Sequence, residues 1–128
     1  FSLDYLMPDL DKLMALEVGE NGKRLSGGEA KRLCLVRSLM SGADVLIWDD
    51  PFSSVDLILE KEIILALKKH KMIEGKTVIL TGHRLSTAKH SEHLIFLDKK
   101  IGIVEEGSVA SLLSENSKTY EYFQKQMV

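Results

Sequence analysis

The sequence predicts an α/β fold in which helices pack on a parallel sheet. Two short apolar runs, at residues 45–48 and 77–80, each end abruptly in polar residues, as the buried strands of such a sheet do. A long amphipathic helical pattern lies between them. Strands that alternate with long helices are typical of α/β domains, so we expect these two strands to be parallel and buried.

Before the first strand, the chain should begin with a short helix and a loop. Leu6, Leu10, Leu13 and Met14 recur at helical spacing, whereas residues 17–23 are rich in glycine and polar side chains.

A second helix is predicted from Ser26 to about Met40, ending at Ser41-Gly42. Leu33 and Val36 share one face with Met40, and Leu35 and Leu39 widen it. We expect this face to pack on the core.

After the first strand, a long helix should start at about Asp56, ahead of the strand at residues 77–80. Residues 94–97 and 101–104 are expected to pair as a hairpin. The chain beyond Ser108 reads as two short amphipathic helices.

Composition indicates one small globular domain. The 128 residues are 45% hydrophobic and 28% charged, and a net charge of −2 gives no case for nucleic acid as a partner. The apolar runs are far too short to cross a bilayer, and the first residues lack the basic segment of a signal peptide. The single cysteine, Cys34, falls in an apolar helical run, so we expect a buried thiol and a reducing compartment.

The second helix opens with Leu25-Ser26-Gly27-Gly28-Glu29, which has the form of a capping box. The Ser26 hydroxyl can accept from the amide of Glu29, whose carboxylate can reach back to the amide of Ser26. Two glycines in a first turn cost roughly 1 kcal/mol each against alanine, which suggests that another group approaches this backbone closely. Bare amides at a helix N-terminus can also hold a phosphate.

Asp49 and Asp50 directly follow the first strand. They should lie at its C-terminal end, where open α/β sheets bind ligands. His83 follows the second strand. If the strands are parallel, His83 can lie near the two acids. Asp56 is a good N-cap for the long helix.

In this order and spacing, these strings resemble the ATP-binding domain of ABC transporters, most closely the exporter branch. The resemblance implies a P-loop NTPase-like parallel sheet with flanking helices. Residues 25–29 resemble the signature motif, residues 45–50 the Walker B strand, residues 53–56 the D-loop and His83 the H-loop.

The resemblance also implies roles for these residues. In the family, the signature motif caps the γ-phosphate of an ATP held by the opposite subunit. Nucleotide contacts are therefore expected from Ser26, Gly27, Gly28 and Glu29, although the family usually has glutamine at the last position. Asp56 would help to couple the two subunits at the nucleotide interface.

By the same resemblance, Asp49 would hold Mg²⁺, Asp50 would orient or activate the attacking water, and His83 would contact the γ-phosphate. Asp50 stands where the family usually has glutamate. Its carboxylate is one methylene shorter, which places it about 1 Å or more from the favoured position. An error of that size can cost on the order of 10²-fold in rate, so we expect slow hydrolysis.

The sequence contains no phosphate-binding loop of the Walker A type. Gly75-Lys76-Thr77 lacks the earlier glycine of that motif and precedes a strand. We therefore expect a partial domain, with residues 1–43 in the helical subdomain and residues 44–128 in the ATPase core. The chain by itself should be inactive, and ATP and Mg²⁺ would bind only to the complete domain dimer.

The implied partners are a second ABC ATPase subunit, identical or different, and a transmembrane domain in the same chain or a partner. The parent protein would lie at the cytoplasmic face of the cell membrane, while the isolated chain would be soluble. Two alternatives stay open. One is a fragment of an ATPase of the chromosome-maintenance and DNA-repair class (SMC type), although no heptads precede Leu25; the other is a non-catalytic module that dimerises or regulates.

Overall fold

The computed structural model describes residues 25–127, so the helix expected at residues 6–14 and the loop after it lie outside the described residues. The chain forms two compact units, with the division between Gly82 and His83. This division reflects packing, and the subdomain boundary expected after residue 43 stays a prediction.

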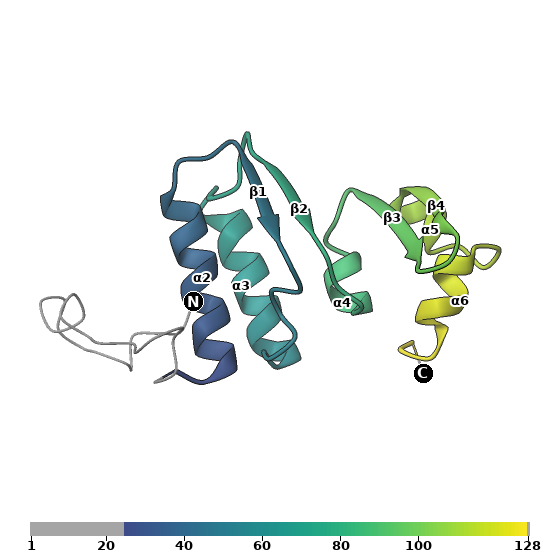
Figure 1. Cartoon of the computed structure of the whole chain (residues 1–128), viewed down its shortest axis with the longest axis horizontal. Coiled ribbons are helices and arrows are strands. Elements are labelled where there is room, and N and C mark those ends of the chain that lie inside the picture. The colour runs from purple at the N-terminus through teal and green to yellow at the C-terminus, as the bar shows by residue number, and fades with distance from the viewer. Residues whose placement is uncertain (1–24, 128) are drawn as a thin grey trace, which may run out of the picture. The chain divides into compact units, whose positions relative to one another are not determined.

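The first unit is a pair of parallel strands with two helices. Its elements are α2 (Gly27–Met40), β1 (Val45–Trp48), α3 (Leu57–Lys69) and β2 (Thr77–Leu80) (Figure 1). The strands pair in parallel, with Val45 opposite Thr77 and Trp48 opposite Leu80. The predicted parallel pair and the long helix between its strands are therefore confirmed.

One hydrophobic core holds this unit together, and residues of both helices and of β1 contribute to it. Its buried members are Leu35, Leu46, Trp48, Phe52, Val55, Ile63, Ile64 and Leu67. The indole Nε1 of Trp48 donates to the Ser38 hydroxyl at 2.8 Å, which satisfies its N–H within the core. Phe52 and Val55 are only 3% and 2% exposed, so the core anchors the turn that follows β1.

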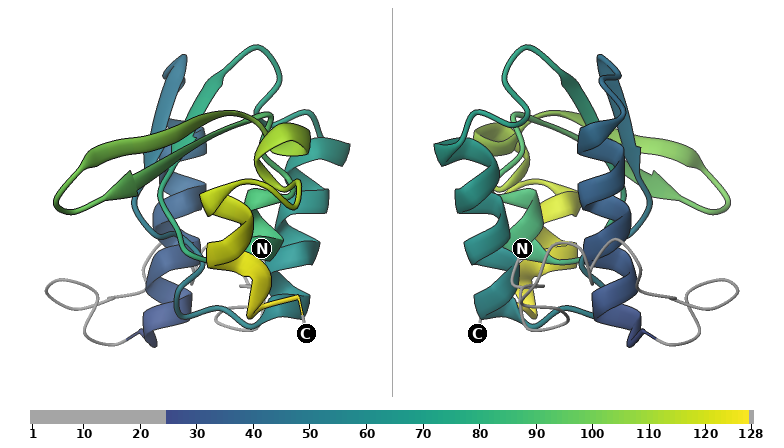
Figure 2. Two further views of the ribbon diagram at one scale, coloured as in Figure 1. Left: turned by 90° about the vertical axis from the view of Figure 1, so that its right-hand side faces the viewer. Right: turned by 90° about the vertical axis from the view of Figure 1, so that its left-hand side faces the viewer.

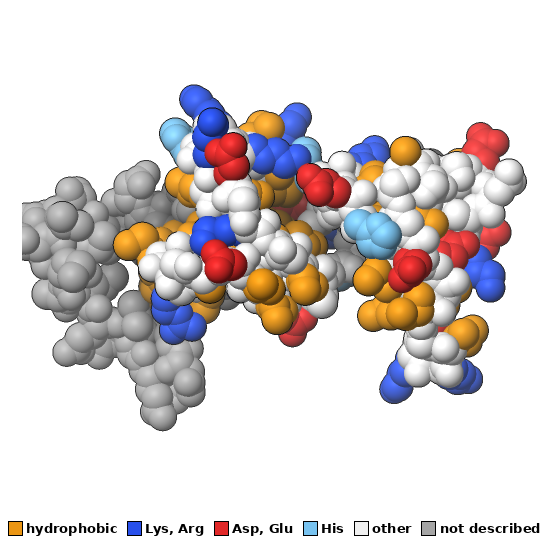
Figure 3. Space-filling model, turned by 90° about the horizontal axis from the view of Figure 1, so that it is seen from above, with side chains coloured by type: hydrophobic (Ala, Val, Ile, Leu, Met, Phe, Trp, Pro, Cys, Tyr) orange, Lys and Arg blue, Asp and Glu red, His pale blue; other side chains and the backbone are white. Residues whose placement is uncertain are grey.

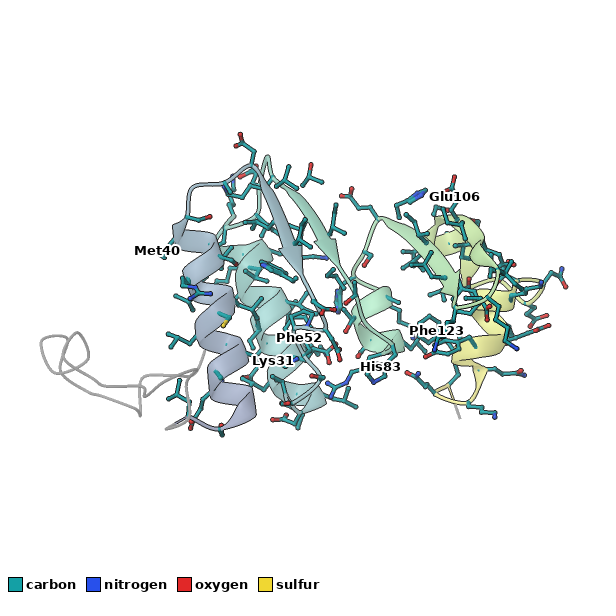
Figure 4. All side chains as sticks on the ribbon, viewed as in Figure 1. Lys31, Met40, Phe52, His83, Glu106 and Phe123 are labelled. Carbon is teal, nitrogen blue, oxygen red and sulfur yellow. The ribbon has the colours of Figure 1, made fainter. Side chains whose placement is uncertain are left out.

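The buried face of α2 differs from the predicted one. Gly28, Arg32 and Leu35 are buried, whereas Leu33 is 39% and Met40 81% exposed (Figure 4). The predicted apolar face is therefore only partly correct: Leu35 lies in the core and Leu39 packs against it, but Leu33 and Met40 do not. A search for apolar spacing does not place Gly28 and Arg32 on a buried face. In the structure, both lie on the side of the helix that packs against the turn after β1.

The strands are buried on one face rather than on both. Leu46 and Trp48 point into the core, while Val45, Ile47 and Ile79 are 54%, 72% and 51% exposed. Within residues 25–127, the core residues of α2 and α3 cover only one side of the pair. Cys34 is also exposed, so the expected buried thiol is wrong. It lies on α2 next to exposed Leu33, away from the buried face.

The second unit combines a hairpin with three short helices. Its elements are α4 (Leu85–Ala88), β3 (His93–Asp98), β4 (Gly102–Ser108), α5 (Val109–Leu112) and α6 (Lys118–Gln124). The hairpin is antiparallel, as predicted, and forms a long ribbon with α5 at the end away from its turn (Figure 2). At the turn, the Asp98 carboxylate accepts from the amides of Lys100 and Ile101. Both helices predicted beyond the hairpin are present.

Leu85, Ala88 and Phe123 form the buried centre of this unit. Hydrophobic side chains also reach the surface in both units (Figure 3). On the hairpin, these exposed side chains are Ile95, Leu97, Ile101 and Ile103. Across the described part of the chain, no helix has the length and apolar character that a membrane span requires.

Candidate functional site

The turn after β1 places the two predicted acids beside Thr81, the residue that follows β2. The Thr81 amide donates to the Trp48 carbonyl at 2.9 Å and so extends the parallel pairing by one step. The Thr81 hydroxyl donates to Asp49 Oδ1 at 2.6 Å, and the Asp50 amide donates to the same hydroxyl at 2.9 Å. One hydroxyl thus holds the carboxylate of Asp49 and the backbone of Asp50 at the carboxyl end of the sheet.

Asp50 adopts a left-handed backbone conformation, with φ of +44°. Non-glycine residues visit this region at a cost of order 1–3 kcal/mol and do so mainly where surrounding contacts enforce it. Two of those contacts are visible: the bond from its amide to Thr81, and a bond of 2.7 Å from the Lys31 ammonium to its carbonyl. Lys31 reaches this turn from α2 (Figure 4). The helix and the turn are therefore tied directly together.

The chemistry of Asp49 suits Mg²⁺. Its carboxylate is exposed, and Oδ1 accepts from Thr81, which fixes the orientation of the group. Mg²⁺ prefers hard oxygen ligands and is usually held by one or two carboxylates together with substrate phosphates and water. A single oriented aspartate at a strand end fits that pattern.

The predicted capping box is present at the start of α2. The Glu29 amide donates to the Ser26 hydroxyl at 3.2 Å, and the Ser26 amide donates to Glu29 Oε2 at 2.7 Å. The Glu29 carboxylate therefore serves its own helix end, where the dipole favours a negative charge. Ser26 and Gly27 are exposed, so the helix tip is open to a ligand.

The two glycines of this tip have different surroundings. Gly28 is buried, and a Cβ added to it would lie 2.7 Å from the carbonyl oxygen of Ser54. At Gly27 an added Cβ would lie 3.3 Å from the Ser54 hydroxyl. The close approach inferred from the sequence is therefore made at Gly28 by the chain itself. The segment resembling the D-loop packs on the segment resembling the signature motif.

Asp56 caps α3. Its Oδ1 accepts from the amides of Ile58 and Leu59 at 3.1 and 3.0 Å, which confirms the predicted capping role. Its expected role in coupling two subunits is separate from this contact and stays a prediction.

His83 is exposed and stands just before α4 in the second unit. Its carbonyl accepts from the side-chain amide of Gln126 at 2.8 Å. Asp49 and Asp50 belong to the first unit, so the expected approach of His83 to these acids stays a prediction.

Sequence reasoning missed three residues that hold this machinery in place: Thr81, Lys31 and Gln126. Only Thr81 gave a usable signal, because it follows the second apolar run as Asp49 follows the first, and a parallel register pairs the two strand ends. Lys31 stands in an ordinary polar position of α2 and Gln126 in the turn after α6, and nothing in their spacing marks them.

Comparison with known proteins gives a consistent result. The family model described as ABC transporter matches residues 7–53. The alpha-hemolysin translocation ATP-binding protein HlyB of Escherichia coli O6:H1 is 41% identical over 105 residues, which is 82% of this chain and 14% of that protein. The leukotoxin translocation ATP-binding protein LktB of Mannheimia haemolytica is 39% identical over the same shares.

Among solved structures, a bacterial Atm1-family ABC exporter with ATP bound is similar to this chain. The TM-score is 0.83 at 28% identity, and the match covers 99% of this chain and 22% of the exporter chain. The chain thus spans only a small part of the length of these relatives. All three are transport proteins by their descriptions, which favours the transporter interpretation over the chromosome-maintenance one.

Proposed function

The chain belongs to the ATP-binding domains of ABC transporters, and we propose that its parent protein hydrolyses ATP to drive export across a membrane. The observation that carries this proposal is the pair of acids at the end of β1, where one threonine hydroxyl bonds the Asp49 carboxylate and the Asp50 backbone amide. A helix tip at which Ser26 and Gly27 are exposed supports it.

In this proposal the residues of the first unit act on two nucleotides. Asp49 holds Mg²⁺, which would neutralise charge on the phosphates of the ATP bound to its own subunit. Asp50 orients the attacking water. Ser26, Gly27 and their neighbours in the signature motif contact the γ-phosphate of the ATP in the opposite subunit.

The tie between α2 and the turn after β1 lets these two tasks influence each other. Lys31 connects the signature helix to the carbonyl of Asp50, and the close packing of Gly28 on Ser54 connects its tip to the D-loop. Asp56 lies at the end of that loop and would couple the two subunits. His83 would contact the γ-phosphate.

The proposed assembly is a head-to-tail dimer of ATPase subunits, identical or different. A transmembrane domain, in the same chain or in a partner, would place the ATPase at the cytoplasmic face of the membrane. By themselves, residues 1–128 would not turn over ATP, because the sequence contains no Walker A loop.

Asp50 gives the sharpest test. In the full-length protein, Asp50→Asn should abolish ATP turnover, because an amide does not act as the base. Asp50→Glu should raise turnover, by up to about 10²-fold, because the longer side chain restores the reach of the carboxylate to the water.

Steady-state phosphate release with Mg²⁺ measures both effects. Asp44→Asn is the matched control, since Asp44 is an exposed aspartate just before β1, at the opposite end of the strand. A wild-type protein without Mg²⁺-dependent turnover would refute the proposed function. An unchanged or lower rate in Asp50→Glu would refute the role given to Asp50.

A further inference from the structure

The side chain of Gln126 binds the backbone on both sides of Arg84. Its Oε1 accepts from the Leu85 amide at 2.9 Å, and its Nε2 donates to the His83 carbonyl at 2.8 Å. A primary amide offers one acceptor and two donors, so it can satisfy a backbone N–H and a backbone carbonyl together. Here it does so across the turn that leads from His83 into α4.

Gln126 is delivered to this turn by a packed helix. Its amide donates to the Phe123 carbonyl at 2.8 Å, which continues the last turn of α6. Phe123 is 6% exposed and packs with Leu85 and Ala88 of α4. The hydrophobic contact and the two side-chain bonds therefore fasten the same two segments together.

The contact with Gln126 helps to fix the segment around His83. Helix α4 contains four residues, and its N-cap, Arg84, makes no side-chain capping bond. So short a helix is not stable by itself, and the first amides of any helix have no partner inside it. Gln126 supplies that partner for the Leu85 amide and holds the adjacent His83 carbonyl.

We propose that Gln126 is a positioning residue for His83. It links the turn after α6 to the backbone at His83, the residue that resembles the H-loop histidine. This inference rests on the proposed function, in which the His83 side chain contacts the γ-phosphate. Loss of the Gln126 amide lets the backbone that carries His83 shift. A misplacement of about 1 Å at a reacting centre can cost on the order of 10²-fold, and a partial shift should lower kcat about tenfold.

Two substitutions in the full-length protein test the bonds that Gln126 makes to the Leu85 amide and to the His83 carbonyl. Gln126→Met keeps the length of the side chain and removes both bonds. Gln126→Glu keeps an oxygen for the Leu85 amide but loses the donor to the His83 carbonyl. Both should lower kcat about tenfold and leave the KM for ATP within about twofold, because His83 is expected to act in the transition state.

Gln124→Met is the matched control. Gln124 lies two residues earlier on α6, is exposed, and makes no side-chain hydrogen bond among the described residues. Its variant should keep the wild-type kcat. A fall in kcat equal to that of Gln126→Met would mean that the surface of α6, rather than the amide contact, matters.

A double-mutant cycle with His83→Ala tests whether Gln126 acts through His83. Residues that act as one unit are not additive, so Gln126→Met should cause no further loss once the histidine is absent. The inference is overturned if Gln126→Met retains the wild-type kcat, or if its full effect persists in the His83→Ala background.

The proposed function and this inference fail separately. The imidazole NMR signals of His83 should shift in Gln126→Met and stay unchanged in Gln124→Met, whether or not the protein turns over ATP. Absent turnover in the wild type would overturn the function. Unchanged His83 signals in Gln126→Met would overturn the positioning role.

Discussion

Replacement of Gly28 by alanine should destabilise the first unit. The new Cβ would lie 2.7 Å from the Ser54 carbonyl oxygen, and reaching ordinary contact at 3.4 Å requires a shift of about 0.7 Å. The Cβ is fixed directly to the helix backbone, and the oxygen belongs to the backbone of Ser54. The segment that carries Ser54 is anchored by buried Phe52 and Val55. Neither side can therefore move at little cost.

Two opposing effects set the magnitude. Overpacking of this kind costs about 1–3 kcal/mol, and alanine recovers up to about 1 kcal/mol of helix propensity over glycine. Because the contact of 2.7 Å is with a backbone oxygen, the cost should lie in the upper part of that range, about 2–3 kcal/mol. After the gain in helix propensity, the free energy of unfolding should fall by about 1–2 kcal/mol in Gly28→Ala. In the control Gly27→Ala the nearest atom is the Ser54 hydroxyl oxygen at 3.3 Å, which can rotate away. That variant should be as stable as the wild type or slightly more stable.

Urea unfolding of the chain measures both values. Trp48 is the only tryptophan, is 6% exposed and lies in the core of this unit, so its fluorescence reports the loss of that core directly. Equal stability of Gly28→Ala and Gly27→Ala would refute the close packing of the helix tip on the segment after Asp50.

Two further predictions concern the strand end and the second unit. Thr81→Val in the full-length protein should lower kcat about tenfold, because the isosteric side chain no longer donates to Asp49 or accepts from the adjacent amide. Thr77→Val, at the exposed start of the same strand, should leave kcat unchanged, and equal effects would contradict the role of the hydroxyl. In β4, the backbone amides of the first two residues of α6 lower the pKa of Glu105, and the Thr119 hydroxyl adds to this effect. The folded state binds the proton of the Glu105 carboxyl group less tightly than the unfolded state does. The carboxylate therefore stabilises the fold at pH values above the unfolded-state pKa of about 4.3, and this contribution is lost as pH falls through the lower pKa of the folded state. Thermal unfolding followed by circular dichroism should therefore give Glu105→Gln a lower Tm than the wild type at pH 7. The difference in Tm should narrow toward pH 3, and a difference independent of pH would contradict the assignment.

Local signals predicted most of the elements correctly. The capping box at Ser26 and the cap at Asp56 involve partners two or three residues away, so the sequence itself contains the whole interaction. The apolar runs of β1 and β2 are short, continuous and followed by polar residues, and these properties also depend only on neighbours in the chain. The same holds for the turn at Asp98.

Which face of a helix or strand is buried was harder to predict than whether the element forms. The apolar face assigned to α2 was correct for Leu35 but wrong for Leu33 and Met40. A buried row that contains Gly28 and Arg32 does not look like a core face in a periodicity count. The strands were expected to be buried, whereas Val45 and Ile47 are exposed. The pattern of side chains shows which residues share a face of a helix or strand. It does not show against which face another element packs.

The sequence by itself determined the family motifs, the order of the elements and the caps that start the two long helices. Only the tertiary structure decided which groups orient the predicted acids and the histidine segment. The contacts of Lys31, Thr81 and Gln126 join residues 19, 31 or 32, and 41 or 43 positions apart. Such contacts depend on the register of β1 against β2 and on how helices pack, and these are properties of the folded chain rather than of any window of its sequence.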